Sequence, residues 1–202
     1  MIVLDNFFDE PYRVRGDALK YTYNPSPDGK WPGFRFRTPE FLGSQLVTGI
    51  GDFLHKDLVV CNSFLQWSDE SWITGAAHSD VTDYTSLIFL SLDEPPNTGI
   101  EIYPKASDDR KIYETQTSIE WDKWLGELGD FYQSDRDWVK RFLFNKKLES
   151  HNSKFKNPCV VSNRFNRCVV FDSKCYHRAQ NFFGTTISNS RLTLISFLNL
   201  NT

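Results

Sequence analysis

The strongest strand signal in the chain is the run Tyr84-Thr85-Ser86-Leu87-Ile88-Phe89-Leu90-Ser91-Leu92. Apolar and β-branched residues dominate it, and the turn-forming stretch Asp93-Glu94-Pro95-Pro96-Asn97-Thr98-Gly99 follows directly. An apolar run of this length with turn residues at its end is typical of a buried β-strand. Residues 99–103 then run back as a second strand, so a β-sheet is predicted at the centre of the chain.

Similar strand patterns flank this run on both sides. They cover Val59–Trp67 before it, and Cys168–Phe171 and Leu192–Leu198 after it. Residues 105–157 interrupt the series with a charged segment whose apolar spacing indicates two short helices with a break near Gly129-Asp130. We interpret this segment as a helical insertion packed on the sheet, or as a lid.

Helices are expected ahead of the strands. The stretch Asp9–Leu19 begins with acidic residues and has Pro11 in its first turn, as helix starts often do. A second helix should cover about 40–56, with an apolar face made by Phe41, Leu42, Leu46, Ile50 and Phe53. Residues 24–39 lie between the two helices and carry so much Pro and Gly that we expect no regular structure there.

These elements predict one domain over residues 1–202. Its fold class is mainly β with α: a double-stranded β-helix (jelly roll) buttressed by N-terminal helices, with one helical insertion. Residues 1–58 would be the helical support, 59–104 and 158–202 the jelly-roll core, and 105–157 the insertion or lid. A chain of 202 residues is long enough to bury a core of this kind.

Composition and charge argue against several classes of protein. The net charge is -3, so no general positive field attracts nucleic acid or an anionic membrane surface. No apolar run reaches the roughly 18 residues that a membrane span needs, and the start Met1–Asp5 has no leader-like pattern. We therefore expect a cytoplasmic, intracellular protein with no membrane partner, and nucleic acid is disfavoured as a partner.

The cysteines do not form a framework. There are four of them at irregular spacing, namely Cys61, Cys159, Cys168 and Cys175. Disulfide scaffolds belong to shorter secreted chains, and no Cys-x-x-Cys pair is present for a zinc knuckle. We expect all four thiols to be reduced and mostly buried. A zinc site made by Cys175 and His177, which share a face if extended, is a weaker alternative.

Two of the four histidines have chemically suggestive surroundings. His78 and Asp80 are two positions apart just before the central strand, and residues i and i+2 of an extended chain point to one face. His177 follows the strand Cys168–Asp172. The pair His78 and Asp80 taken alone is most often just a polar turn entering a strand. The remaining histidines, His55 and His151, lie in polar stretches and are expected to be solvated.

The last strand adds a candidate anion site. Arg191 and Thr193 share a face if extended, so a guanidinium and a hydroxyl can bind one carboxylate. An arginine directed into a β-barrel needs a partner, because a buried unpaired charge is costly. Two imidazoles and one carboxylate on one face of an iron leave its other positions open for substrate and oxygen.

The order of these motifs resembles that of the iron(II)- and 2-oxoglutarate-dependent dioxygenases. It runs from His-x-Asp through a strand to a late histidine and then to Arg-x-Thr fourteen positions later. The chain looks most like the prolyl-4-hydroxylase-like branch, and within it like an uncharacterised set of bacterial and phage proteins. The stretches that carry the resemblance are Asn6–Pro11, Trp31–Arg35, Phe165–Phe171, His177, Phe183-Gly184 and Arg191–Leu194.

The resemblance implies roles for particular residues. His78, Asp80 and His177 would be the metal ligands, and no catalytic residue is implied beyond them. Arg191 and Thr193 would bind 2-oxoglutarate, with Tyr84 and Tyr103 as candidates for a further hydroxyl contact to it. Thr98-Gly99-Ile100-Glu101 departs from the Gly-Gly-x-Thr-like turn that the family usually has at this point, so that wall of the pocket is expected to differ.

The activity implied by the resemblance is hydroxylation of a C–H bond in a peptidyl or free amino acid. Iron(II), O2 and 2-oxoglutarate would be required, and succinate and CO2 would be released. The partners would be a small-molecule or a peptide or protein substrate. A halogenase is disfavoured because Asp80 occupies the position that halide would need. The non-enzymatic alternative is a jelly-roll module that binds a metal or a small anion.

Overall fold

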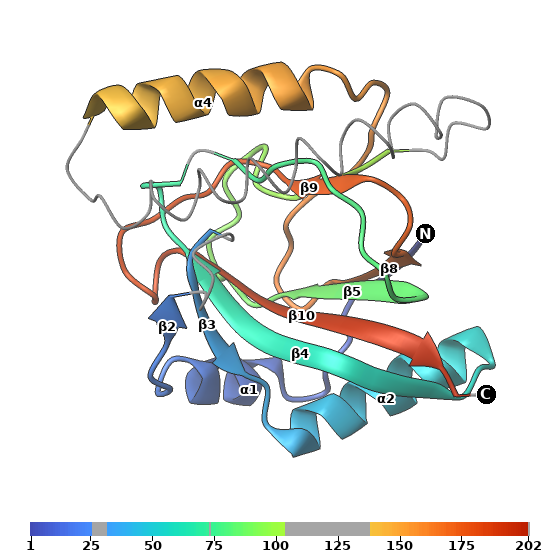
Figure 1. The fold of residues 1–202 in the computed structure, drawn as a ribbon. Helices are drawn as coiled ribbons and strands as arrows, with labels where there is room; N and C mark the ends of the chain where they lie inside the picture. The colour runs from blue at the N-terminus through green and yellow to red at the C-terminus, as the bar shows by residue number, and fades with distance from the viewer. Residues whose placement is uncertain (26–31, 73, 104–137, 202) are drawn as a thin grey trace.

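Two antiparallel β-sheets face each other in the computed structural model of the protein (Figure 1). The structure describes residues 1–25, 32–72, 74–103 and 138–201. The larger sheet has seven strands in the order β1-β8-β5-β10-β4-β3-β2, and the smaller has three in the order β7-β6-β9. A two-sheet arrangement of antiparallel strands is what the sequence predicts for a jelly roll.

The larger sheet is built around the long pair β4 (Leu58–Ser68) and β10 (Arg191–Leu200). These strands pair from Arg191 opposite Ser68 to Leu200 opposite Leu58, with one shift in register between Phe197 and Leu198. The other strands of this sheet are β1 (Ile2–Leu4), β2 (Asn24–Pro25), β3 (Phe34–Arg37), β5 (Tyr84–Phe89) and β8 (Cys168–Asp172).

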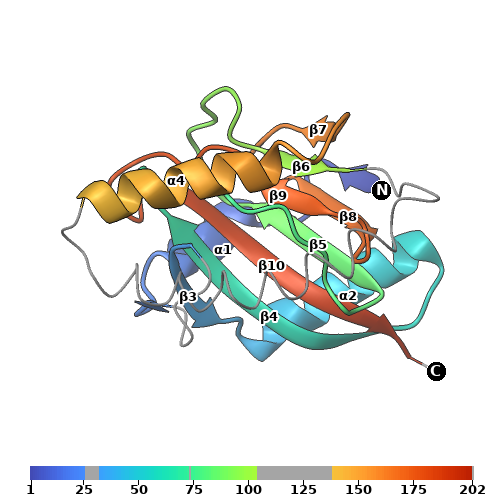
Figure 2. The same cartoon turned by 45° about the horizontal axis from the view of Figure 1, so that its top comes forward.

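The smaller sheet consists of β6 (Ile100–Ile102), β7 (Cys159–Val161) and β9 (His177–Ala179). Helix α4 (Trp138–Asn152) runs alongside it, and in Figure 1 β9 lies between α4 and the larger sheet. Figure 2 shows the same helix passing across β9 and β6. The C-terminal end of α4 contacts the segment that precedes β5, where Asn152 and His151 bond to the backbone of Ala77.

Strand alternation divides the core into two parts. Ile88, Leu192 and Leu194 pack with the helices α1 (Pro11–Ala18) and α2 (Glu40–Leu54) on one face of the larger sheet. The residues next to them along each strand point to the other face of the sheet, because side chains alternate along a strand. Leu87, Phe89 and Val169 of the larger sheet pack there against Ile100, Ile102 and Val161 of the smaller sheet. The space between the sheets is therefore partly filled by apolar side chains.

Both predicted N-terminal helices exist, but the apolar face of α2 is narrower than expected. Leu42, Leu46 and Ile50 lie four residues apart and are buried against the sheet. Phe41 and Phe53, which the pattern placed on the same face, are 50% and 53% exposed. The buried stripe follows the i, i+4 row, and these two phenylalanines lie to either side of it.

The N-terminal segment contributes strands as well as helices, which corrects two predictions. β1, β2 and β3 belong to residues 1–58, so this segment is more than a helical support. Residues 24–39 include β2 and β3, although no regular structure was expected there. Gly33 takes the left-handed φ of +79° directly before β3, and Phe34 stacks on Trp67 of β4 at a centroid distance of 4.7 Å. Such cross-strand aromatic pairs stabilise the pairing of neighbouring strands.

The insertion is described only in part. Residues 138–152 form α4, in agreement with the second of the two helices predicted for 105–157. The first predicted helix and the break near Gly129-Asp130 lie outside the described residues. No helix in the part of the chain that the structure describes combines the length and the apolar character of a membrane span.

The four cysteines form no disulfide with one another. Cys168 is buried and Cys175 is half-buried, whereas Cys61 and Cys159 are exposed. The expectation of mostly buried thiols is therefore wrong for two of the four.

Candidate metal centre

A cavity of about 270 Å³ lies between the two sheets. Side chains from β3, β4, β5, β6, β8, β9, β10 and α4 line it, together with the segment that precedes β5. The lining residues include Arg35, Asn62, Phe64, Gln66, Gly75, Ala76, His78, Asp80, Thr85, Leu87, Leu148, Phe171, His177, Arg191, Thr193 and Ile195. Cavities between packed layers of secondary structure are common sites for small molecules.

The structure brings His78, Asp80 and His177 together at this cavity. One ligand atom from each lies within 4.8 Å of the others. Nε2 of His177 is 3.4 Å from Oδ2 of Asp80, and Nε2 of His78 is 3.7 Å from Oδ1 of the same carboxylate. His78 and His177 form an antiparallel bridge whose two backbone hydrogen bonds measure 3.0 and 2.8 Å. The backbone itself therefore places the two imidazoles side by side.

Both imidazoles are oriented by their own loops. Nδ1 of His78 lies 2.8 Å from the carbonyl oxygen of Ala76, and Nδ1 of His177 lies 3.0 Å from that of Cys175. A carbonyl oxygen accepts only, so Nδ1 is the protonated nitrogen in both rings. Nε2 then carries the lone pair on the side of Asp80, which is the arrangement that metal-binding histidines have.

Asp80 is held by its own partners on the strand side. Its backbone N–H donates to the carbonyl oxygen of Ser173 at 2.8 Å. Its Oδ2 accepts a hydrogen bond of 2.8 Å from Oγ1 of Thr85, which lies 2.8 Å from Oγ of Ser173. Thr85 and Ser173 were not predicted as site residues. The alternation of β5, which turns Thr85 to the cavity, was the available signal for the first of them.

The protonation states suit a cation. Burial and the neighbouring His177 lower the pKa of His78 to about 4. Burial alone would raise the pKa of Asp80, but the adjacent imidazoles of His177 and His78 and the hydrogen bond from the Thr85 hydroxyl outweigh it and lower the pKa to about 2. At neutral pH the cavity therefore presents a neutral His78 and an ionised Asp80, and both states are those of metal ligands.

Arg191 is a buried cation at the same cavity and is only 3% exposed. Its Nη1 donates to the carbonyl oxygens of Thr98 and Gly99, and its guanidinium carbon lies 5.1 Å from the centre of the Phe89 ring. Its Nη2 is buried and has no hydrogen-bond partner among the described residues. Burial lowers the pKa of Arg191 to about 9, so the group is still charged at neutral pH.

This cation fits an incoming carboxylate. A buried charge with an unsatisfied N–H is costly unless an anion completes it. Thr193 lies two residues further along β10, is buried, and lines the same cavity. The hydroxyl of Thr193 has a long contact of 3.4 Å to the carbonyl oxygen of Gln66. The turn that was expected to differ from the family, Thr98-Gly99, supplies the carbonyl groups that orient Arg191.

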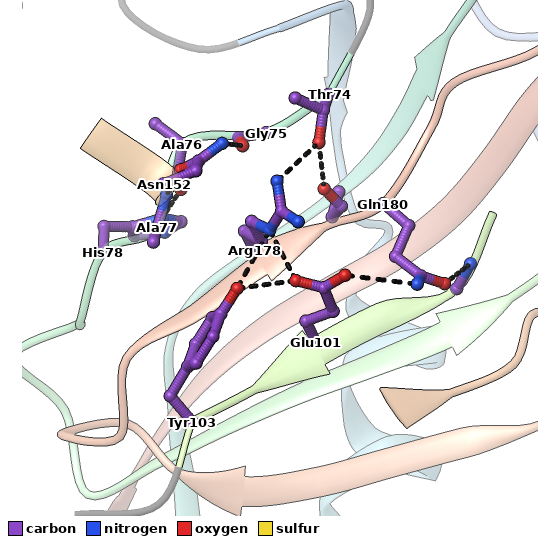
Figure 3. Close-up of polar contacts among 12 residues, drawn as sticks. Thr74, Gly75, Ala76, Ala77, His78, Glu101, Tyr103, Asn152, Arg178 and Gln180 are labelled. Carbon is purple, nitrogen blue, oxygen red and sulfur yellow. Dashed lines mark hydrogen bonds and ion pairs between the residues drawn. The ribbon is translucent and has the colours of Figure 1, made fainter. Parts of the chain in front are cut away.

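Neither predicted tyrosine lines the cavity. Tyr84 packs with the core on the helix-covered face of the larger sheet, and its hydroxyl accepts a hydrogen bond of 2.5 Å from Lys56. Tyr103 lies on the face of the small sheet that carries Glu101, and its hydroxyl donates to Oε2 of Glu101 at 2.6 Å (Figure 3). Because side chains alternate along a strand, the neighbouring residues Thr85 and Ile102, and not the two tyrosines, face the space between the sheets.

One further expectation about a side chain changes. His151 is only half exposed, and its Nε2 donates to the carbonyl oxygen of Ala77 at 2.7 Å, so it is not simply solvated. On β4 the cavity is lined by Asn62, Phe64 and Gln66, which alternate along the strand. The alternation of these residues can be recognised in the sequence, but the sequence does not show which of the two faces of β4 lines the cavity.

Comparison with known proteins rests on structure. No protein-family model matches the sequence, and no curated protein matches it. An oxidoreductase of the 2OG-Fe(II) oxygenase family from Burkholderia pseudomallei has a TM-score of 0.60 and 11% identity, over 98% of this chain and 83% of that one. The chain has the fold of the 2-oxoglutarate- and iron(II)-dependent oxygenases. The predicted jelly roll is thereby confirmed.

Two other solved structures share this oxygenase fold. HygX from Streptomyces hygroscopicus, solved with nickel and 2-oxoglutarate bound, has a TM-score of 0.59 and 13% identity, over 99% of this chain and 82% of HygX. A prolyl-4-hydroxylase from Pseudomonas putida has a TM-score of 0.54 and 12% identity, over 100% of this chain and 92% of that one. At these identities the likeness concerns the fold.

Proposed function

We propose that the protein is a non-haem iron(II)- and 2-oxoglutarate-dependent dioxygenase in which His78, Asp80 and His177 hold the metal. The observation that carries this proposal is the convergence of one carboxylate and two Nε2 lone pairs on one point of the cavity. Two histidines and one carboxylate with open positions form the ligand set of non-haem iron(II) oxygenases.

Arg191 and Thr193 are the groups that would bind the far carboxylate of 2-oxoglutarate. They lie on one face of β10 in the cavity that holds the three ligands. The unsatisfied Nη2 of Arg191 and the weakly bonded hydroxyl of Thr193 are the donors available for it. A charge-assisted bond from a buried guanidinium orients the ligand as well as binding it.

When bound, iron(II) would supply the activation of O2 that couples conversion of 2-oxoglutarate to succinate and CO2 with hydroxylation of a C–H bond. The chain itself holds and orients the reactants. Thr85 keeps the Asp80 carboxylate in place, and the carbonyl groups of Ala76 and Cys175 keep the rings turned. The apolar side chains Leu87, Phe171 and Ile195 line the same cavity and limit access of water to it.

The substrate that we propose is an amino acid side chain, either free or within a peptide. The Pseudomonas putida prolyl-4-hydroxylase shares the fold over 92% of its own length, which supports this class. HygX has also been solved with hygromycin B bound, so the fold accommodates small molecules as well.

The metal assignment is tested by replacing His177. Anaerobic addition of iron(II) and 2-oxoglutarate to the wild-type protein should produce the weak visible metal-to-ligand band, and aerobic turnover should release succinate. His177→Ala should abolish the band and lower succinate release to background, because a ligand is lost. His55→Asn is the matched control, because His55 is an exposed residue at the end of α2 with φ of +54°, which asparagine tolerates.

Two outcomes would overturn parts of the proposal. If His177→Ala releases succinate at the wild-type rate, the ligand assignment is wrong. If the wild-type protein binds iron(II) at these residues but neither shows the band nor consumes 2-oxoglutarate, the protein is a jelly-roll module that binds a metal or a small anion, and the oxygenase proposal fails.

A further inference from the structure

Asn152 at the C-terminal end of α4 reaches the loop that carries His78 (Figure 3). Its Nδ2 donates to the carbonyl oxygen of Gly75 at 3.1 Å, and its Oδ1 accepts from the backbone N–H of Ala77 at 2.9 Å. Asn152 is only 7% exposed. An asparagine with both ends of its amide satisfied by one short loop holds that loop in a single conformation.

The two hydrogen bonds bracket the residue that orients the imidazole. Ala76 lies between Gly75 and Ala77, and its carbonyl oxygen is the partner of Nδ1 of His78 at 2.8 Å. The amide of Asn152 therefore determines how the peptide groups on both sides of Ala76 are turned. Rotation of either group would swing the Ala76 carbonyl away from the ring and release His78 from its orientation.

The loop needs such support because its own backbone provides little. Residues 74–77 belong to no helix or strand. Besides the bonds to Asn152, the N–H of Gly75 donates to the carbonyl oxygen of Ala179 at 3.1 Å, and His151 donates to the carbonyl oxygen of Ala77 at 2.7 Å. The loop is thus fixed from two sides, by β9 below and by the end of α4.

We propose that Asn152 is a positioning residue for the metal ligand His78, acting through the carbonyl group of Ala76. This inference rests on the proposed function, since it assigns His78 a metal to bind. Groups that orient a ligating histidine typically contribute 10–100-fold to metal affinity. It also makes the end of the insertion, which was expected to pack on the sheet or to act as a lid, part of the apparatus that holds the metal.

The competing explanation is that Asn152 only attaches α4 to the rest of the molecule. Asn166 provides a matched control, because it makes the same kind of double contact elsewhere. Its Oδ1 accepts from the N–H of Phe8 at 2.9 Å, and its Nδ2 donates to the carbonyl oxygen of Phe8 at 2.9 Å. Asn166 is 4% exposed and lies outside the cavity. Its φ of +62° adds backbone strain to an alanine there, so this control loses at least as much stability.

The experiment compares Asn152→Ala and Asn166→Ala in the full-length chain. Cobalt(II) affinity is measured by calorimetry, the cobalt(II) absorption spectrum reports ligand geometry, and denaturant unfolding reports stability. Both variants should unfold at lower denaturant concentration than wild type. Asn152→Ala should weaken cobalt(II) binding about 10–100-fold and alter the spectrum, whereas Asn166→Ala should change the affinity less than about threefold and leave the spectrum as in wild type.

Equal cobalt(II) affinity and equal spectra in the two variants would overturn the inference. If Asn152→Ala does not fold, Asn152→Gln replaces it, because the longer side chain keeps both polar groups but cannot hold both loop contacts at their present spacing. The same criterion then applies. A wild-type protein that binds no cobalt(II) would overturn the proposed function, whereas normal wild-type binding with an unaffected Asn152 variant would overturn this inference alone.

Discussion

Arg191 is the residue whose environment is least satisfied without a ligand. It is buried, and none of the described residues that hydrogen-bond to it offers a carboxylate. Its Nη2 has no hydrogen-bond partner among the described residues. The groups that do contact it, the carbonyl groups of Thr98 and Gly99 and the ring of Phe89, fix its direction without neutralising it. A dianionic ligand would supply what is missing.

Replacing Arg191 by methionine should therefore weaken 2-oxoglutarate binding and leave metal binding intact. Hydrogen bonds to charged groups contribute about 1.5–3 kcal/mol, so the dissociation constant should rise roughly 10–150-fold. Titration of 2-oxoglutarate into the cobalt(II)-loaded protein under anaerobic conditions measures it. Arg13→Met is the matched control, since Arg13 has the same charge, is exposed on α1 and does not line the cavity. Unchanged affinity in Arg191→Met would remove this residue from the ligand site.

At the site, the motifs of the sequence predicted which side chains the fold brings together. His78, Asp80 and His177 do converge, and Arg191 and Thr193 do share a face of the cavity. The two candidate tyrosines do not line the cavity, because neighbouring residues of a strand point to opposite faces of the sheet. The contacts of Asn152 could not be predicted, because it bonds to backbone atoms about 75 residues away along the chain and every residue type has these backbone atoms.

At the scale of elements, β6 and β9 are joined by a polar cluster on the face that carries Tyr103. Nε of Arg178 donates to Oε2 of Glu101 at 2.6 Å, and the hydroxyl of Tyr103 donates to the same oxygen (Figure 3). Gln180 donates to Oε1 of Glu101 at 3.3 Å and accepts from the N–H of Gly99 at 3.0 Å. The cluster thus connects the strand that begins with His177 to the turn that orients Arg191.

Breaking one member of this cluster should destabilise the small sheet. Arg178→Met leaves the mostly buried carboxylate of Glu101 without its charged partner, and we expect a loss of about 1–3 kcal/mol in the free energy of unfolding. The double variant Glu101→Leu with Arg178→Met removes both charges and should recover most of that loss. Denaturant unfolding of the wild type, Arg178→Met, Glu101→Leu and the double variant measures the coupling. Additive losses would show that the pair does not act as a unit.

The elements that the sequence predicted well are those with a long alternating or helical pattern. β4, β5, β8 and β10 have apolar runs or apolar alternation long enough to be recognised, and α2 has a clear i, i+4 row. β3 has four residues and depends on its neighbour, since Phe34 stacks on Trp67 and Phe36 stacks on Tyr21 at 4.2 Å. A strand stabilised by tertiary aromatic contacts cannot be recognised from its own residues.

At the scale of the whole molecule, the three ligands come from two separate structural units. His78 and Asp80 precede β5 of the larger sheet, and His177 begins β9 of the smaller sheet. The helices α1 and α2 pack on the opposite face of the larger sheet and do not line the cavity. A metal held by these residues would link the smaller sheet to the larger one at the open side of the core.

Loading the protein with cobalt(II) and 2-oxoglutarate should therefore stabilise it unevenly. A ligand at 100 times its dissociation constant adds about 2.7 kcal/mol, which for a chain of this length raises Tm by roughly 5–10 °C. In hydrogen exchange the strands β6 and β9 should gain more protection than α1 and α2, because the ligands connect β9 to the remainder of the core while the helices already pack on the far face. A chelator should reverse both effects. Protection that increases only in the helices would mean that the metal binds elsewhere than between the sheets.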